Sequence, residues 1–107
     1  MNRWNIPDGL EREVIARDTC CVYCGKPFVS CEGARRSRAS WEHIINDARI
    51  VTRANIALCC IGCNASKGTK TVELWFSSEY CKLRGISANT VAAVVREALS
   101  EGSKKTV

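Results

Sequence analysis

The chain has 107 residues, of which 46% are hydrophobic, and this length suits one small domain. Its 16 Lys and Arg against 11 Asp and Glu give a net charge of +5. No stretch approaches the roughly 20 apolar residues of a membrane span, and the first residues lack the apolar core of a secretory signal. We therefore expect a cytoplasmic protein that has no membrane partner.

The positive charge is concentrated in the middle of the chain. Residues 25–70 carry eight basic side chains and three acidic ones, whereas the remaining residues carry eight of each sign. A basic centre between neutral flanks is typical of a protein that binds a polyanion, most often nucleic acid through its phosphates. A basic surface that contacts only solvent is the alternative.

The first predicted element is a helix that begins at Asp8 and ends before Cys20. Its apolar residues Leu10, Val14 and Ile15 are expected on one face. Acidic residues near its start suit the positive end of the helix dipole.

A basic loop and a hairpin are expected next. Segment 25–40 contains two glycines, a proline and several arginines, which predicts an irregular loop. Residues 41–45 and 50–57 hold β-branched and aromatic residues on either side of the turn-forming pair Asn46-Asp47. They predict two short antiparallel strands.

Helices are expected after the hairpin. A short one occupies residues 62–70, where Gly68 loosens or ends it. Segment 71–84 predicts a single amphipathic helix that Gly85 stops. Its apolar residues at helical spacing are Val72, Trp75, Phe76, Tyr80 and Leu83.

The last predicted helix begins at a capping residue, Ser87 or Asn89, and runs to Gly102. Its apolar stripe is expected in the core and consists of Val91, Val94, Val95, Ala98 and Leu99. We therefore treat residues 1–107 as one domain, with a metal-binding core at about 17–70, a helical segment at about 71–101 and a flexible tail at 102–107. The expected fold class is α+β, with an N-terminal helix and two C-terminal helices around a small core.

Two C-x-x-C pairs predict a zinc site. They are Cys21 with Cys24 and Cys60 with Cys63, and four thiolates in such pairs can bind one zinc ion tetrahedrally. A glycine follows the first pair and another lies inside the second, which lets the backbone turn around the metal. His43 is the only histidine, so the paired histidines of a C2H2 finger are excluded.

The doubled cysteines leave an alternative register, in which Cys20 or Cys59 replaces its neighbour as a ligand. The pairs are 35 residues apart, which is longer than the 15 to 20 of a plain zinc ribbon, so an element is inserted between them. Cys20, Cys31, Cys59 and Cys81 are expected to be small buried hydrophobic residues, and a disulfide is the less favoured alternative in a reducing compartment.

The residues around these pairs resemble the HNH endonuclease family. The matching text is RDTCCVYCGK at 17–26, EHII at 42–45 and NIALCCIGCNASK at 55–67. The resemblance covers residues 17–68, about half of the chain. It depends on the order of the elements, because each piece alone is common.

The resemblance implies a ββα-metal fold in which two strands and a helix surround one catalytic cation, Mg2+ or Mn2+, while zinc is structural. His43 would be the general base that activates a water, a task that suits its ordinary pKa. Glu42, on the opposite side of the strand, and Asn64, at the start of the helix, would ligate the cation. Asn55 would hold the loop after His43 through hydrogen bonds.

The implied substrate is DNA, cut at a phosphodiester bond, with no small-molecule substrate. One site per chain predicts that a monomer nicks one strand, whereas a weak homodimer could cut both strands. Basic residues would contact the phosphates, although each could instead be solvated. The candidates are Arg35, Arg36, Arg38, Arg49, Arg53, Lys67 and Lys70.

This chain departs from the commonest family text. Glu42 replaces an Asp, Asn64 replaces a frequent final His, and the turn after the first strand lacks the usual Pro and glycines. Asp47 in that turn either shapes the turn or approaches the metal.

Two other functions compete with the nuclease. A non-catalytic zinc-knuckle module would bind nucleic acid through the same basic surface. A structural zinc domain would dock another protein through the helix that contains Trp75, Phe76 and Tyr80.

Overall fold

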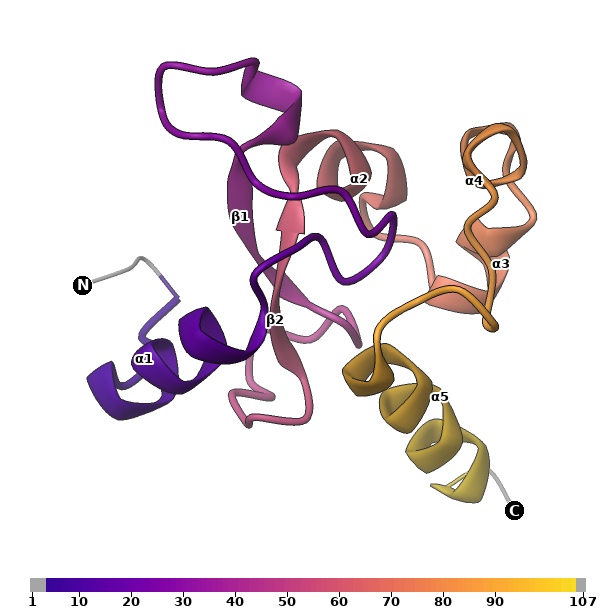
Figure 1. The fold of residues 1–107 in the computed structure, drawn as a ribbon. Helices are drawn as coiled ribbons and strands as arrows, with labels where there is room; N and C mark the ends of the chain where they lie inside the picture. The colour runs from indigo at the N-terminus through magenta and orange to yellow at the C-terminus, as the bar shows by residue number, and fades with distance from the viewer. Residues whose placement is uncertain (1–3, 106–107) are drawn as a thin grey trace.

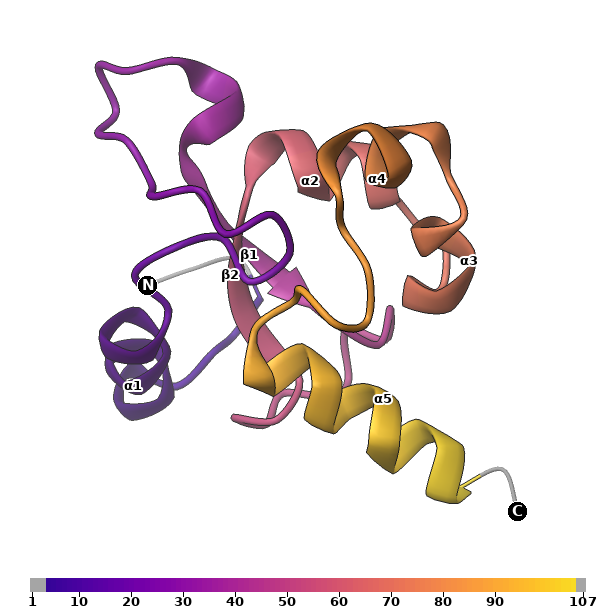
Figure 2. The same cartoon turned by 45° about the vertical axis from the view of Figure 1, so that its right-hand side comes forward.

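Two short antiparallel strands lie at the centre of the molecule, and helices pack on both of their faces (Figures 1 and 2). The computed structural model describes the backbone of residues 4–105 and the side chains of residues 4–100. The elements are α1 (Asp8–Arg17), a 3-10 helix (Arg35–Ser37), β1 (Ala39–His43), β2 (Ile56–Cys60), α2 (Ile61–Lys67), α3 (Val72–Phe76), α4 (Glu79–Arg84) and α5 (Ala93–Lys105). The predicted α+β class is confirmed.

The strand β2 is buried on both faces, and this explains its uninterrupted apolar sequence. Ile56 and Leu58 pack towards α1 in a small cluster with Ile6 and Val14. Ala57 and Cys59 belong to the larger cluster that also contains residues of α3 and α5. Side chains alternate between the two faces of a strand, so a two-stranded sheet separates two cores.

The hairpin is antiparallel as predicted, but its strand boundaries and its loop length differ from the prediction. His43 pairs with Ile56 and Ala39 pairs with Cys60, so residues 44–55 form a long loop between the strands. The prediction of strands at 41–45 and 50–57 is therefore wrong at both boundaries. The observed loop is longer than the predicted turn at 46–49, and the side chain of Asn55 holds it by hydrogen bonds to the backbone of Ile45 and Ile50.

The N-terminal helix occupies the predicted place, but its buried face is narrower than expected. Val14 is fully buried and Leu10 is half-buried, whereas Ile15 is 52% exposed. Successive residues of an α-helix are 100° apart, so Ile15 points away from the face that Val14 occupies.

A buried carboxylate joins α1 to the sheet. Asp18 accepts a hydrogen bond from the backbone N–H of Leu58 at 3.0 Å and forms an ion pair with Arg17 at 2.7 Å. Arg17 also donates to the carbonyl oxygens of Arg53 and Ile56, both at 2.7 Å. The neighbouring carboxylate raises the pKa of Arg17. These contacts fix the end of α1 against the start of β2.

The short helix α2 follows β2 without a loop and ends where the sequence indicated. Its C-terminal cap is Gly68, which has a φ of 53°. A side chain would be strained at this angle, and this is why the glycine ends the helix.

The single helix predicted over 71–84 is two helices. Ser78 accepts a hydrogen bond from the backbone N–H of Cys81 and caps α4, while Thr71 caps α3 in the same way through Leu74. The break turns the second helix, so Leu83 is 75% exposed instead of buried. Three helices therefore follow α2, where two were predicted.

The aromatic residues of this region point into the protein. Trp75 is fully buried, and its ring meets the ring of Tyr23 edge-on at 5.0 Å. Phe76 and Tyr80 are half-buried against the same core. Trp75 is therefore not available on the surface as part of a docking face, whereas Phe76 and Tyr80 are partly exposed.

The last helix begins later and ends later than predicted. Its apolar stripe is in the core as expected, with Val91, Val94, Val95 and Ala98 buried and Leu99 partly buried. Val91 precedes the helix. The backbone N–H of the next residue, Ala92, donates a hydrogen bond to the carbonyl of Val22. The helix continues past Gly102 to Lys105, and the last two residues of the expected tail, 106–107, lie outside the described residues.

The segment between α1 and β1 is irregular, as its glycines and proline predicted. Two isolated bridges, Cys20 with Pro27 and Val29 with Arg38, hold it together. Among the described residues, no helix is both long and apolar enough to cross a membrane.

Replacing Asp18 by Ala should lower the free energy of unfolding by about 2–4 kcal/mol, because it leaves Arg17 and the N–H of Leu58 without their partner. Urea denaturation of the metal-loaded protein measures this change. Glu13→Ala, which removes the exposed ion pair with Arg53 at 3.1 Å, is the control and should cost less than about 1 kcal/mol. Equal losses in the two variants would contradict the central role of Asp18.

Candidate metal centre and adjoining polar site

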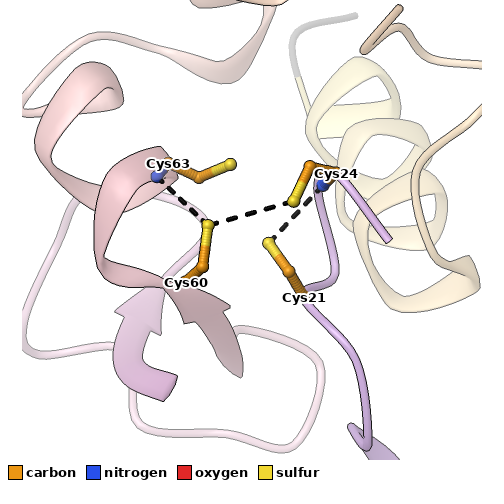
Figure 3. Close-up of side chains that lie close together, drawn as sticks. All are labelled: Cys21, Cys24, Cys60 and Cys63. Carbon is orange, nitrogen blue, oxygen red and sulfur yellow. Dashed lines mark hydrogen bonds between the residues drawn. The ribbon is translucent and has the colours of Figure 1, made fainter. Parts of the chain in front are cut away.

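Four cysteines meet where residues 21–24 approach the junction of β2 and α2 (Figure 3). The sulfur atoms of Cys21, Cys24, Cys60 and Cys63 all lie within 4.8 Å of one another. The sulfur atoms of Cys24 and Cys60, one from each pair, are 3.9 Å apart. The structure thus brings together the four residues of the favoured register.

The backbone shapes each pair in the same way. The N–H of Cys24 points at the sulfur of Cys21, and the N–H of Cys63 points at the sulfur of Cys60. The second contact also caps the N-terminus of α2, so one sulfur serves both the helix and the cluster. Gly25, with a φ of 77°, supplies the turn after the first pair.

The cluster fits a metal such as zinc in both geometry and chemistry. A tetrahedral zinc ion with Zn–S bonds of about 2.3 Å holds its sulfurs about 3.8 Å apart, and small shifts would bring the four atoms to that spacing. Contacts with the thiols of Cys21 and Cys63 lower the pKa of Cys60, and contacts with the thiols of Cys21 and Cys60 raise the pKa of Cys63. A divalent cation that replaces the shared protons would stabilise all four as thiolates.

The other four cysteines lie outside the cluster. Cys59 and Cys81 are buried, which agrees with their predicted role as small hydrophobic residues. Cys20 is only half-buried and Cys31 is exposed, so for Cys31 that prediction is wrong. Cys31 lies in the irregular loop, which has little core to bury it.

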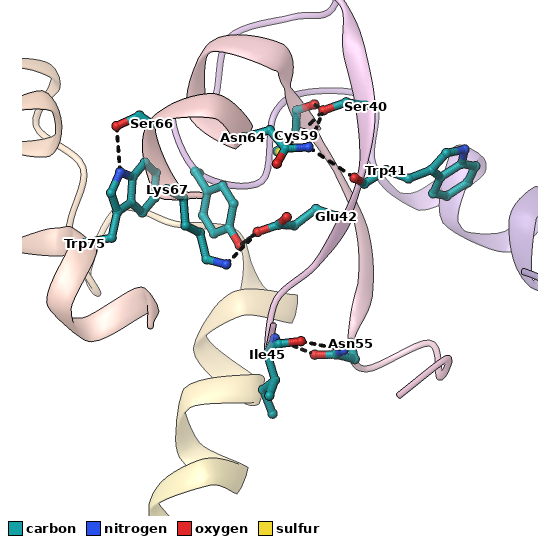
Figure 4. Close-up of polar contacts among 11 residues, drawn as sticks. Ser40, Trp41, Glu42, Ile45, Asn55, Cys59, Asn64, Ser66, Lys67 and Trp75 are labelled. Atoms are coloured by element: carbon teal, nitrogen blue, oxygen red, sulfur yellow. Dashed lines mark hydrogen bonds and ion pairs between the residues drawn. The ribbon is translucent and has the colours of Figure 1, made fainter. Parts of the chain in front are cut away.

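A buried polar group lies between β1 and α2, next to the cluster (Figure 4). Glu42 accepts a hydrogen bond from the hydroxyl of Tyr23 at 2.6 Å and forms an ion pair with the ammonium of Lys67 at 3.0 Å. The side chains of Lys67 and Glu42 are 2% and 8% exposed. Burial and the neighbouring carboxylate raise the pKa of Tyr23 well above its ordinary value, so its hydroxyl keeps its proton and donates.

Asn64 projects from α2 into the same space. Its amide nitrogen donates to the hydroxyl of Ser40 at 3.1 Å and to the carbonyl of Trp41 at 3.2 Å. These bonds orient the amide, and its oxygen is left to act as a ligand or acceptor. The two contacts of Glu42 described above involve its Oε2 atom, so Oε1 is likewise left to act as a ligand. One carboxylate oxygen and one amide oxygen are a donor pair that Mg2+ accepts.

His43 ends β1 on the opposite face of the strand. Its ring meets the ring of Trp4 edge-on, with centroids 5.1 Å apart. Within the described residues, its Nε2 is the one buried side-chain nitrogen or oxygen that has no hydrogen-bond partner. Burial lowers the pKa of His43, while Glu42 and Asp47 oppose this effect and Lys67 adds to it. His43 and Glu42 are thus neighbours in the chain whose side chains have different surroundings.

Asn55 holds the loop that follows His43. Its oxygen accepts from the backbone N–H of Ile45 at 2.7 Å, and its nitrogen donates to the carbonyls of Ile45 and Ile50 at 3.2 and 3.1 Å. These are the loop contacts expected of it, and they orient the chain two residues beyond His43. Any part of Asn55 in catalysis stays a prediction.

The predicted phosphate-binding residues fall into four groups. Arg35, Arg36 and Lys70 are exposed, whereas Arg38 is half-buried and donates to the carbonyl of Gly33. Arg49 and Arg53 are exposed but pair with acidic residues. Lys67 is different, because it lies in the interior against Glu42 and, as placed here, contacts a carboxylate instead of a phosphate.

Asp47 belongs to the turn and has Arg49 as its partner. Its carboxylate accepts from the backbone N–H and from the guanidinium of Arg49. The guanidinium lowers the pKa of Asp47 to about 2. Of the two roles considered for Asp47, the turn role is the one that these contacts display.

Sequence reasoning missed two residues of this region, Tyr23 and Tyr80. Tyr23 lies inside the first C-x-x-C pair, so its position near the metal site was visible, but its contact with Glu42 depends on the fold. The hydroxyl of Tyr80 donates to the sulfur of Cys63 at 3.3 Å. Nothing in the sequence separates Tyr80 from the apolar stripe in which it lies.

No protein-family model, no curated protein and no solved structure matches this chain.

Cys21→Ser or Cys63→Ser should abolish retention of one zinc ion per chain and unfold the domain, because three thiolates no longer close the site. Zinc content after dialysis and circular dichroism measure both effects. Cys20→Ser and Cys31→Ser are matched controls that should keep the metal. Loss of zinc in Cys20→Ser with retention in Cys21→Ser would establish the alternative register.

Proposed function

We propose that this protein is a metal-dependent DNA endonuclease with a structural zinc ion and a ββα-metal core made of β1, β2 and α2. The observation that carries the proposal is the unpartnered, buried imidazole nitrogen of His43, at the end of β1 and next to Glu42. A buried polar atom without a partner is costly, and such atoms are concentrated at functional sites. The family resemblance assigns catalysis to the same residue.

His43 is the group that would take a proton from the attacking water. A neutral imidazole needs an acceptor nitrogen that no protein donor occupies, and Nε2 forms no hydrogen bond with another described residue. Trp4 covers one edge of the ring and fixes its orientation. The substrate phosphate would approach the end of β1, where the strand enters the loop after His43.

Glu42 and Asn64 would hold a catalytic Mg2+ or Mn2+ through their remaining oxygens. A bound divalent cation would stabilise negative charge at the phosphate and on the leaving oxygen. Tyr23, Ser40 and the backbone of Trp41 orient these two side chains through hydrogen bonds. Asn55 would keep the loop after His43 in place, and the exposed Arg35, Arg36 and Lys70 would contact phosphates.

The ion pair of Glu42 with Lys67 favours a second candidate, a zinc-knuckle module that binds nucleic acid without cutting it. The carboxylate is already neutralised by an ammonium at 3.0 Å, so the interior is balanced without a second metal. In the nuclease, the cation must share Glu42 with Lys67 or displace it. The two candidates therefore differ in whether this site binds a divalent cation.

Lys67→Met should separate the two candidates, because it leaves the buried charge of Glu42 unpaired. The expected cost is about 3 kcal/mol in the free energy of unfolding. Under the nuclease proposal, Mn2+ restores part of this loss, so it raises the melting temperature of the variant more than that of the wild type. Lys70→Met removes an exposed charge close to the same helix and should behave as wild type. If Mn2+ does not change the melting temperature of either protein, the proposed cation site is absent.

The proposed activity predicts that zinc-loaded protein converts supercoiled plasmid to open circles when Mg2+ or Mn2+ is added. His43→Ala should reduce the rate by about 10²–10⁴-fold, because it removes the general base. Asn64→Ala should weaken the dependence on the cation, while Asn89→Ala, at an exposed residue, is its matched control. Equal rates for wild type and His43→Ala would exclude His43 as the base. DNA binding without cutting by intact wild type would establish the second candidate.

A further inference from the structure

A basic groove lies beside the cysteine cluster, away from the Glu42 and Asn64 side of α2. Its volume is about 400 Å³, and Lys26, Arg36 and Arg84 line it together with Tyr80 and the cluster residues Cys24 and Cys60. A second hollow of about 440 Å³ adjoins it, shares Arg36 and Tyr80 with it, and adds Arg35. No acidic residue is among those that line either space.

The cations of this groove have no acidic partner within the described residues. The basic side chains that form ion pairs are Arg17, Arg49, Arg53 and Lys67, and all of them lie elsewhere. By contrast, Lys26, Arg35, Arg36 and Arg84 come from three different parts of the chain and form no ion pair with a carboxylate of the described residues. Like charges gathered in one hollow repel one another, so the arrangement favours an anion from outside the chain.

Arg84 is held in position by its surroundings. Its guanidinium lies over the ring of Tyr80, 3.7 Å from the centroid, and donates to the backbone carbonyl of Tyr80 at 3.3 Å. The hydroxyl of Tyr80 is in turn bonded to the sulfur of Cys63. The metal cluster therefore anchors the tyrosine, and the tyrosine supports the arginine. A preplaced guanidinium loses less side-chain entropy when it binds a phosphate.

Gly62 allows the two walls of the groove to approach each other. A Cβ at this position would lie 3.3 Å from the hydroxyl of Tyr80 and 3.4 Å from the carbonyl of Arg36. The first is a tight contact and the second is close to ordinary van der Waals distance, so an added Cβ would require the hydroxyl of Tyr80 to move by a few tenths of an ångström. The glycine inside the second C-x-x-C pair thus serves the groove as well as the metal-binding turn.

A competing explanation is that these cations only balance the charge of the metal site. A zinc ion with four thiolates carries a net charge of about −2. The three cations of the groove, with Arg35 close by, exceed this charge. Arg84 is also held by the ring and the backbone carbonyl of Tyr80.

We propose that this groove binds backbone phosphates of the nucleic acid on which the protein acts, through Lys26, Arg36 and Arg84. This inference rests on the proposed function, since it takes DNA as the partner. It extends the contact surface from the polar site, across α2, to the cysteine cluster and α4. Residues Lys26, Arg84 and Tyr80 thereby acquire a role that the sequence pattern did not assign to them.

The test is the salt dependence of binding to a short fluorescent DNA duplex, measured on zinc-loaded protein without added Mg2+ or Mn2+. Each phosphate contact contributes about 0.9 to the slope of log K against log salt between about 50 and 200 mM. Lys26→Gln and Arg84→Gln should each lower the magnitude of that slope by about 1, and the double variant by about 2. Lys82→Gln is the matched control, because Lys82 is exposed on the same helix and does not line the groove.

The outcomes distinguish the groove from the nuclease. Unchanged slopes in both groove variants would overturn this proposal. They would not contradict the nuclease proposal, which plasmid nicking tests separately. Loss of zinc from Arg84→Gln with an unchanged slope would show that the charge serves the thiolates instead, which also overturns it. Reduced slopes with full zinc content support the groove, even if the wild type never cuts DNA. Binding of the wild type that does not depend on salt would exclude phosphate contacts altogether.

Discussion

The meeting of two cysteine pairs from distant parts of the chain is the constraint on which the rest of the structure depends. The second pair spans the junction of β2 and α2, and a cluster sulfur caps the helix. Fixing this junction fixes the rotation of α2 about its axis. Asn64 and Lys67, three residues apart, therefore face β1, while Gly62 faces the basic loop.

Two ion pairs contain buried carboxylates, and each ion pair connects two elements of secondary structure that share little apolar surface. Asp18 with Arg17 connects α1 to β2, and Glu42 with Lys67 connects β1 to α2. Burying an ion pair costs much of what the attraction returns, so such pairs specify an arrangement more than they stabilise it. In a small protein with two thin cores, that specificity positions the sheet between its helices.

The sequence predicted well wherever a local rule decided the outcome. The cysteine spacing identified the four clustered residues, Gly68 ended its helix, and the stripe from Val91 to Ala98 was buried as expected. Predictions failed where two local rules competed. The apolar residues on either side of Ser78 have the spacing of one continuous helix. The side chain of Ser78 instead caps a second helix, α4, by accepting a hydrogen bond. Asn55 similarly replaced a short turn with a long, side-chain-bonded loop.

The sequence by itself indicated the components of this protein: a small α+β fold, four cysteines spaced for a metal, and a basic centre. Only the tertiary structure decided which charges meet. Lys67 reads as one more surface cation, yet it lies against Glu42, while Lys26 and Arg84, 58 positions apart, line one groove. The physical reason is that spacing along the chain fixes local geometry, whereas contacts between charges depend on how α2 and α4 pack around the cluster.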